Sequence, residues 1–213
     1  MQVIVSKPPK KIAGIIEQLK DNKFYIILLV FLIFGMLIGS LTINEIGEPF
    51  LNLINEWFKS FVNFRSTAGF IKIFFNVFLT SLTYIFLIGV SAFGIGGLPI
   101  IPLIIFLRGY GTISISSILY CKYSLQGIAF ADLILLPSCI ALDFIILYFS
   151  SVSFKTSYDF LRAKKYNDDS HAELRLSCVK LLHKALFCLI AIIIASLIEA
   201  AFTACFIDYF NFT

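Results

Sequence analysis

Residues 91–112 read SAFGIGGLPIIPLIIFLRGYGT, and this stretch joins two apolar runs through glycine and proline. Glycine gives the backbone the freedom that a tight turn requires, and proline is tolerated in the first turn of a helix. The stretch therefore predicts a helical hairpin with a short connection. The glycines and prolines that we expect to act as its hinge are Gly94, Gly96, Gly97, Pro99 and Pro102. Pro102 lies inside the second run, where it either kinks the helix or marks a re-entrant segment.

The composition assigns the chain to the integral membrane proteins. Of the 213 residues, 59% are hydrophobic and only 14% are charged, against roughly 25% charged in an average globular domain. A soluble fold cannot bury this much apolar surface, whereas helices that face lipid need not bury it. We expect a single domain over residues 1–213. Its fold class is all-α, a polytopic membrane bundle with about five transmembrane helices and additional amphipathic interfacial helices.

The predicted membrane spans are apolar segments of roughly 20 residues or more, the length that crosses a bilayer. They cover residues 24–43, 71–93, 98–120, 126–150 and 185–207. Lysine and arginine gather in segments 1–23 and 151–184, which the positive-inside rule therefore places in the cytoplasm. The loop 44–70 is poor in them and is predicted to be extracytoplasmic. This predicts a multi-pass protein of the cell membrane, with its N-terminus inside and its C-terminus outside.

Two segments between or before the spans are amphipathic. Segment 1–23 contains apolar residues at helical spacing among lysines, which is typical of a helix on the inner leaflet. After Pro49, apolar side chains again recur at helical spacing. This outer helix either rests on the outer leaflet, with Trp57 as an interfacial anchor, or contacts a partner protein. The residues of its apolar stripe, our candidates for a partner contact, are Phe50, Ile54, Trp57, Phe61 and Phe64.

Polar residues inside the predicted spans are the first candidates for a function, because a charge at membrane depth costs about 2.5–3.5 kcal/mol to insert. Asp132 and Asp143 lie about 16 Å apart along one predicted helix, so they cannot form a two-aspartate catalytic centre. His171 and His183 both fall outside the spans, which argues against a serine–histidine site in the membrane. We therefore expect no enzyme activity. The polar residues of the spans are Arg108, Asp132, Asp143, Glu199 and Asn76.

Arg108 and Asp143 are predicted to neutralise each other. They lie about 15 Å and about 10 Å from the cytoplasmic ends of neighbouring spans, and an arginine side chain can cover that offset. The simpler interpretation is thus an ion pair with a purely structural role. The alternative is a polar path for an ion or small solute, formed by Asp132, Asp143 and Glu199.

Other short patterns carry less information. Gly35 and Gly39 form a GxxxG spacing that lets helices approach closely, either within the chain or between copies in a homo-oligomer. The five cysteines include no CxxC pair, so we expect neither a disulfide framework nor a metal site. No motif indicates a cofactor. The mixed charges of segment 151–184 do not indicate binding to nucleic acid.

The order of these features resembles the stage II sporulation protein M family of endospore-forming bacteria. The resemblance covers about residues 24–207 and rests on FGMLIGS (34–40), IGVSAFGIGGLPII (88–101), LIIFLRGYGT (103–112) and LILLPS (133–138). It implies a non-catalytic scaffold in the lipid bilayer. Such a scaffold recruits peptidoglycan-degrading enzymes, stage II sporulation proteins D and P, to the septum for engulfment. The alternative function is a transporter or permease subunit that uses the intramembrane polar residues.

Overall fold

The computed structural model describes residues 22–42, 56, 59–61, 63–65, 67–166 and 171–206. Every secondary-structure element in these residues is helical, which confirms the predicted all-α class. The elements are α2 (Lys23–Thr42), α4 (Phe70–Ala92), α5 (Gly97–Phe130), the π-helical turn η1 (Ala131–Leu135), α6 (Leu136–Tyr166) and α7 (His171–Phe206). Within the described residues, five helices are long and apolar enough to cross a membrane. The chain is therefore a multi-pass membrane protein.

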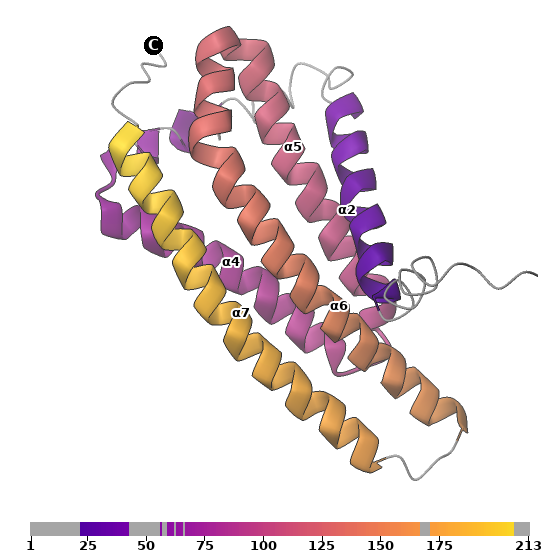
Figure 1. Ribbon diagram of the computed structural model, residues 1–213. Coiled ribbons are helices and arrows are strands. Elements are labelled where there is room, and N and C mark those ends of the chain that lie inside the picture. Colours follow the sequence, from indigo (N-terminus) through magenta and orange to yellow (C-terminus); the bar gives the residue numbers. More distant parts are fainter. Residues whose placement is uncertain are drawn as a thin grey trace, which may run out of the picture.

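The first three spans agree closely with the prediction, but the last two helices are longer than expected. The fourth span belongs to a helix that continues to Tyr166, and α7 already begins at His171. Segment 151–184, predicted as a cytoplasmic loop of mostly helical structure, is thus largely a helical hairpin formed by the ends of these two helices (Figure 1). Residues 151–184 contain no glycine or proline that would end a helix. Ser177 also joins the two arms, because its Oγ donates to Asp159 Oδ2 at 3.0 Å.

Helical structure also continues through the reversal between the third and fourth spans. The third span ends at Cys121 and the fourth begins at Leu125. Tyr120 Oη donates to Asp132 Oδ1 at 2.9 Å, although these residues are 12 positions apart. In a straight helix that separation is about 18 Å. The chain must therefore turn back on itself between them, which it does at the top of Figure 1.

The glycine-rich hinge forms the predicted tight hairpin between α4, which ends at Ala92, and α5, which begins at Gly97. A Cβ atom on Gly97 would lie only 2.2 Å from the carbonyl oxygen of Ser91, so no larger residue fits there. The hydroxyl of Ser157 on α6 donates to the carbonyl oxygen of Gly94 at 2.5 Å and holds the turn. Helix α5 continues past Pro102 to the far reversal, so a re-entrant segment at Pro102 is wrong.

The GxxxG pair packs inside the chain, with α2 lying along α5. A Cβ atom on Gly35 would lie 2.2 Å from the carbonyl oxygen of Phe106, and one on Gly39 would lie 2.8 Å from that of Tyr110. Gly109 makes the reciprocal approach, because its Cβ would lie 2.4 Å from the carbonyl oxygen of Leu32. Of the two predicted uses of the GxxxG spacing, the structure shows packing within one chain.

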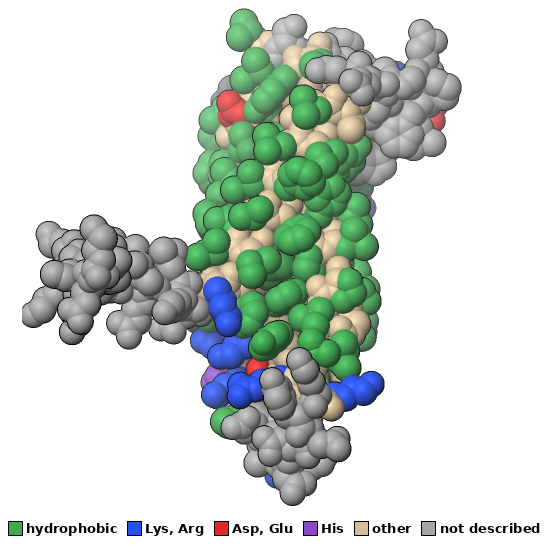
Figure 2. Space-filling view, turned by 90° about the vertical axis from the view of Figure 1, so that its right-hand side faces the viewer, with side chains coloured by type: hydrophobic (Ala, Val, Ile, Leu, Met, Phe, Trp, Pro, Cys, Tyr) green, Lys and Arg blue, Asp and Glu red, His purple; other side chains and the backbone are tan. Residues whose placement is uncertain are grey.

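The surface separates into an apolar band and a basic end. Figure 2 shows hydrophobic side chains over the middle of this face, while lysine and arginine gather towards its lower part. Exposed Lys155, Arg162 and Arg175 belong to the α6–α7 hairpin. The start of α2 lies at this end too, because the ring of Phe24 is 5.5 Å from that of Phe154. The predicted orientation, with both basic segments in the cytoplasm, remains a prediction.

Helices α4 and α5 diverge from their shared hinge (Figure 1). Helix α5 packs mainly along α2, whereas α4 packs mainly along α7 and α6. The short connection therefore holds the two helices together at one end and leaves them apart further along. The space between them is bounded by α6 and α7, and this arrangement positions the candidate site.

Candidate functional site

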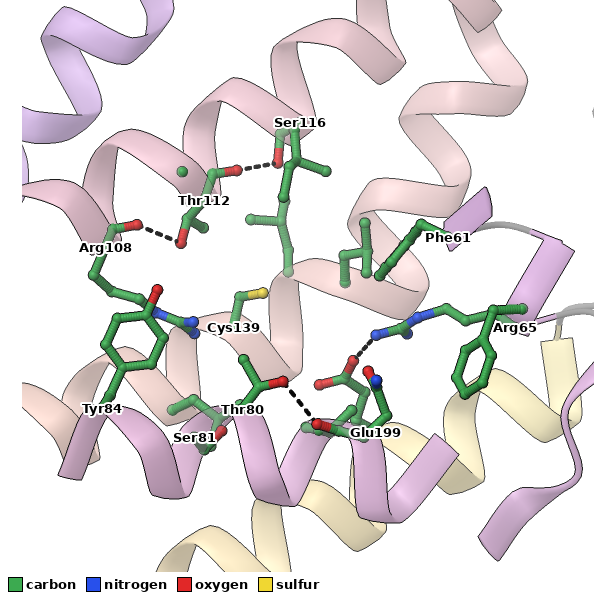
Figure 3. A pocket seen from close by; sticks show the side chains of 18 of the residues that line it. Phe61, Arg65, Thr80, Ser81, Tyr84, Arg108, Thr112, Ser116, Cys139 and Glu199 are labelled. Atoms are coloured by element: carbon green, nitrogen blue, oxygen red, sulfur yellow. Dashed lines mark hydrogen bonds and ion pairs between the residues drawn. The ribbon is translucent and has the colours of Figure 1, made fainter. Parts of the chain in front are cut away.

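A cavity of about 520 Å³ lies between α4, α5, α6 and α7. This volume falls within the range of small-molecule sites, about 300–1,000 Å³. Its wall combines apolar side chains with hydroxyls, an amide, a thiol and three charged groups (Figure 3). The charged residues of the wall are Arg65, Arg108 and Glu199.

Two helical rows supply most of the uncharged polar groups. Residues one turn apart share a helix face, and each row lines one side of the cavity. The row on α4 is Asn76, Thr80 and Tyr84, and the row on α5 is Arg108, Thr112 and Ser116. The hydroxyls of Thr80 and Thr112 donate to backbone oxygens one turn earlier, at 2.8 and 3.0 Å. Their oxygens remain available as acceptors, which suits a site for a polar solute.

Arg108 and Asp143 form the ion pair predicted from the sequence. Arg108 Nε donates to Asp143 Oδ1 at 2.8 Å, and the two side chains are only 13% and 7% exposed. The guanidinium carbon lies 5.0 Å from the centre of the Tyr84 ring, so a cation–π contact adds to the pair. Arg108 lines the cavity, whereas Asp143 stands behind it and does not.

A second ion pair joins Arg65 to Glu199 and was not predicted. Arg65 Nη2 donates to Glu199 Oε1, and Arg65 Nη1 donates to Thr203 Oγ1 at 3.2 Å. The guanidinium carbon also lies 4.4 Å from the centre of the Phe61 ring. Both charged side chains are nearly buried, at 6% and 4% exposed. Phe61 and Arg65, from the segment before α4, and Glu199 of α7 therefore close this side of the cavity. Thr203, one turn further along α7, holds Arg65 in place.

Sequence reasoning missed Arg65 because it was assigned to the extracytoplasmic loop 44–70. One signal was present. The predicted spans hold three carboxylates, Asp132, Asp143 and Glu199, but only two cationic side chains, Arg108 and Lys72. Buried carboxylates need cationic partners, so the imbalance called for a further lysine or arginine from a neighbouring segment. Arg65 follows an aromatic stretch directly before the second span and meets that requirement.

The polar path proposed through Asp132, Asp143 and Glu199 is wrong as a set. Asp132 is exposed and accepts the Tyr120 hydrogen bond at the chain reversal, away from the cavity. Asp143 is held behind Arg108. Only Glu199 reaches the cavity wall, together with the predicted Asn76. The reason is their depth along the fourth span, because the two residues lie about 16 Å apart along the helix axis. Asp132 falls in the turn η1 next to the chain reversal, whereas Asp143 lies buried deeper in the bundle.

The apolar stripe of the outer helix is described only in part. Phe61 and Phe64 both line the cavity, and Phe61 stacks on Arg65. Phe50, Ile54 and Trp57 lie outside the described residues. The two phenylalanines thus face a site within the chain, while a partner contact through the other three remains a prediction.

Cys139 of α6 lies in the cavity wall, and Figure 3 shows it between Arg108 and Glu199.

Among the described residues, no group of three or more histidine, cysteine or acidic side chains could hold a metal ion. Comparison with protein-family models, curated proteins and solved structures finds no match for this chain. The functional argument therefore rests on the residues themselves.

Proposed function

We propose that this protein binds a small polar solute inside its membrane bundle and acts as a transporter or permease subunit. The observation that carries the proposal is the cavity of about 520 Å³ with Arg65, Arg108 and Glu199 in its wall. Charges at membrane depth are costly, and they are tolerated where they line a hydrated site or a solute pathway. No catalytic step is part of this proposal.

The uncharged wall supports the same function. If the two ion pairs only stabilised the bundle, we would expect apolar side chains to enclose them and no cavity to lie beside them. Here the described wall adds Asn76, Thr80, Ser81, Thr112 and Ser116 to the charges. Convergent polar groups in a concave, partly apolar site are typical of solute recognition.

The native cysteines provide a direct test. Two variants would each keep one cysteine, either Cys139 in the cavity wall or Cys188, which is 1% exposed in the apolar core. The full chain in liposomes would be treated with a small hydrophilic methanethiosulfonate at mildly alkaline pH, because the thiolate is the reacting form. We expect Cys139 to be modified and Cys188 to be protected. Equal protection of both cysteines would overturn the proposal.

The scaffold role implied by the resemblance is the second candidate. Residues 59–61 and 63–65 are helical, which supports the predicted outer helix on which a partner would dock. Trp57 is the better residue to test, since Phe61 also contacts Arg65. With Trp57→Ala, we expect the protein to stay inserted at normal levels but to lose co-purifying wall-degrading proteins. Equal recovery from the wild type and the variant would contradict a docking role for this side chain.

A further inference from the structure

We infer that the solute is a small zwitterion, whose anionic group binds Arg108 and whose cationic group binds Glu199. The inference rests on the proposed function, because it names the class of solute that the same cavity takes. It follows from the hydrogen-bonding capacity that remains at these two side chains, and from the charge balance of the wall.

Arg108 keeps its terminal nitrogens for a ligand. Its Nε is occupied by Asp143. Among the described residues, Nη1 and Nη2 have no hydrogen-bond partner. These two nitrogens form the planar end of the guanidinium fork, which matches the two oxygens of a carboxylate. Asp143 and Tyr84 hold the side chain in place, so it presents a fixed anion-binding group.

Glu199 keeps one carboxylate oxygen in the same way. Oε1 accepts the hydrogen bond from Arg65 Nη2, whereas Oε2 has no partner among the described residues. Arg65 cannot turn to a ligand without breaking its bonds, because Nη1 is committed to Thr203. The free oxygen of Glu199 is therefore the natural partner for an ammonium group.

These free atoms are open to the cavity rather than sealed in the protein. The fully enclosed side-chain polar atoms without a partner, within the described residues, are the hydroxyls of Ser114, Ser153 and Ser196. The free atoms of Arg108 and Glu199 are not among them, and both residues line the cavity. The wall thus offers one cationic and one anionic contact.

Charge balance favours a zwitterion over a simple ion. Each charged residue of the wall already has a counter-ion, in the pairs Arg108–Asp143 and Arg65–Glu199. The site is therefore neutral, and a monovalent ion would add an uncompensated charge to a partly desolvated space. A zwitterion adds none, and it supplies a partner to each of the two free groups.

A chain-length series tests the inference in the variant that retains only Cys139. The probes are glycine, β-alanine, γ-aminobutyrate, δ-aminovalerate and ε-aminocaproate, which hold the two charges at increasing separation. Butyrate and butylamine are the single-charge controls. We expect one zwitterion of matching length to slow the modification of Cys139 at concentrations about tenfold lower than either control. No protection by any zwitterion, or better protection by butyrate or butylamine, would overturn the inference.

Paired substitutions then assign the two charges. Arg108→Gln with Asp143→Asn removes one ion pair, and Arg65→Gln with Glu199→Gln removes the other, without leaving an unpaired charge. Each should abolish the preference for the zwitterion while Cys139 stays reactive, whereas Asp132→Asn, away from the cavity, should retain it. If both paired variants still prefer the zwitterion to butyrate and butylamine, the inference is overturned. The proposed function fails separately, if Cys139 does not react with the methanethiosulfonate at all.

Discussion

Arg65 and Glu199 lie 134 positions apart in the sequence and form a buried ion pair. The pair ties the segment before the second span to the last span of the bundle. It also closes one side of the cavity, with Phe61 and Thr203 as its neighbours. This one contact therefore serves both the packing of the bundle and the shape of the candidate site.

Removing one member of this pair should destabilise the bundle strongly. Arg65→Gln leaves the Glu199 carboxylate buried without its counter-ion, and such a loss typically costs about 3–5 kcal/mol. We expect a large fall in the free energy of unfolding, measured by denaturing-detergent titration of the purified protein. The double variant Arg65→Gln with Glu199→Gln should recover part of that loss. A double variant as unstable as Arg65→Gln alone would show that the two side chains are not coupled.

The Arg108–Asp143 pair should show the same coupling at the other side of the cavity. Arg108→Leu alone leaves a buried carboxylate, whereas Arg108→Leu with Asp143→Leu replaces both charges by apolar groups. We expect the double variant to unfold at higher denaturant than Arg108→Leu. The second single variant is Asp143→Leu. If the double variant loses as much free energy of unfolding as the two single variants together, the two side chains are not coupled.

The close approach of α2 and α5 should not tolerate a methyl group at Gly35. Its Cβ would lie 2.2 Å from the Phe106 carbonyl oxygen, so the helices must separate. Overpacking of this kind typically costs about 1–3 kcal/mol. Gly89→Ala is the matched control, since its Cβ would lie an ordinary 3.7 Å from Phe149. Thermal denaturation in detergent should show a clearly lower melting temperature for Gly35→Ala and an unchanged one for Gly89→Ala. Equal melting temperatures of the two variants would contradict the close packing of α2 against α5.

The predicted orientation can be measured by cysteine labelling in a cysteine-free background. Lys59→Cys should react with an impermeant maleimide added to intact cells, because segment 44–70 is predicted to be outside. Lys164→Cys, in the basic α6–α7 hairpin, should react only after the cells are opened. The reverse pattern would invert the topology.

The membrane spans could be predicted because each depends on local composition. A helix that crosses lipid satisfies its own backbone hydrogen bonds, so hydropathy along one segment is sufficient to locate it. The glycine-rich hinge was predictable for a similar reason, since a turn of four residues is set by its own sequence. The Arg108–Asp143 pair also followed, because a reversal of the chain places the spans that carry them side by side.

Other features were decided by the tertiary structure alone. Three features depend on how the helices pack and cross. They are the contact of Arg65 with Glu199, the burial of Asp143 while Asp132 stays exposed at the reversal, and the cavity between α4 and α5. Lipid solvates apolar helix faces as well as a neighbouring helix does, so hydropathy carries no information about which faces meet. The sequence by itself determined a five-span bundle with a glycine hinge. Its packing, through close contacts such as Gly35 against Phe106, decided which polar groups share one site.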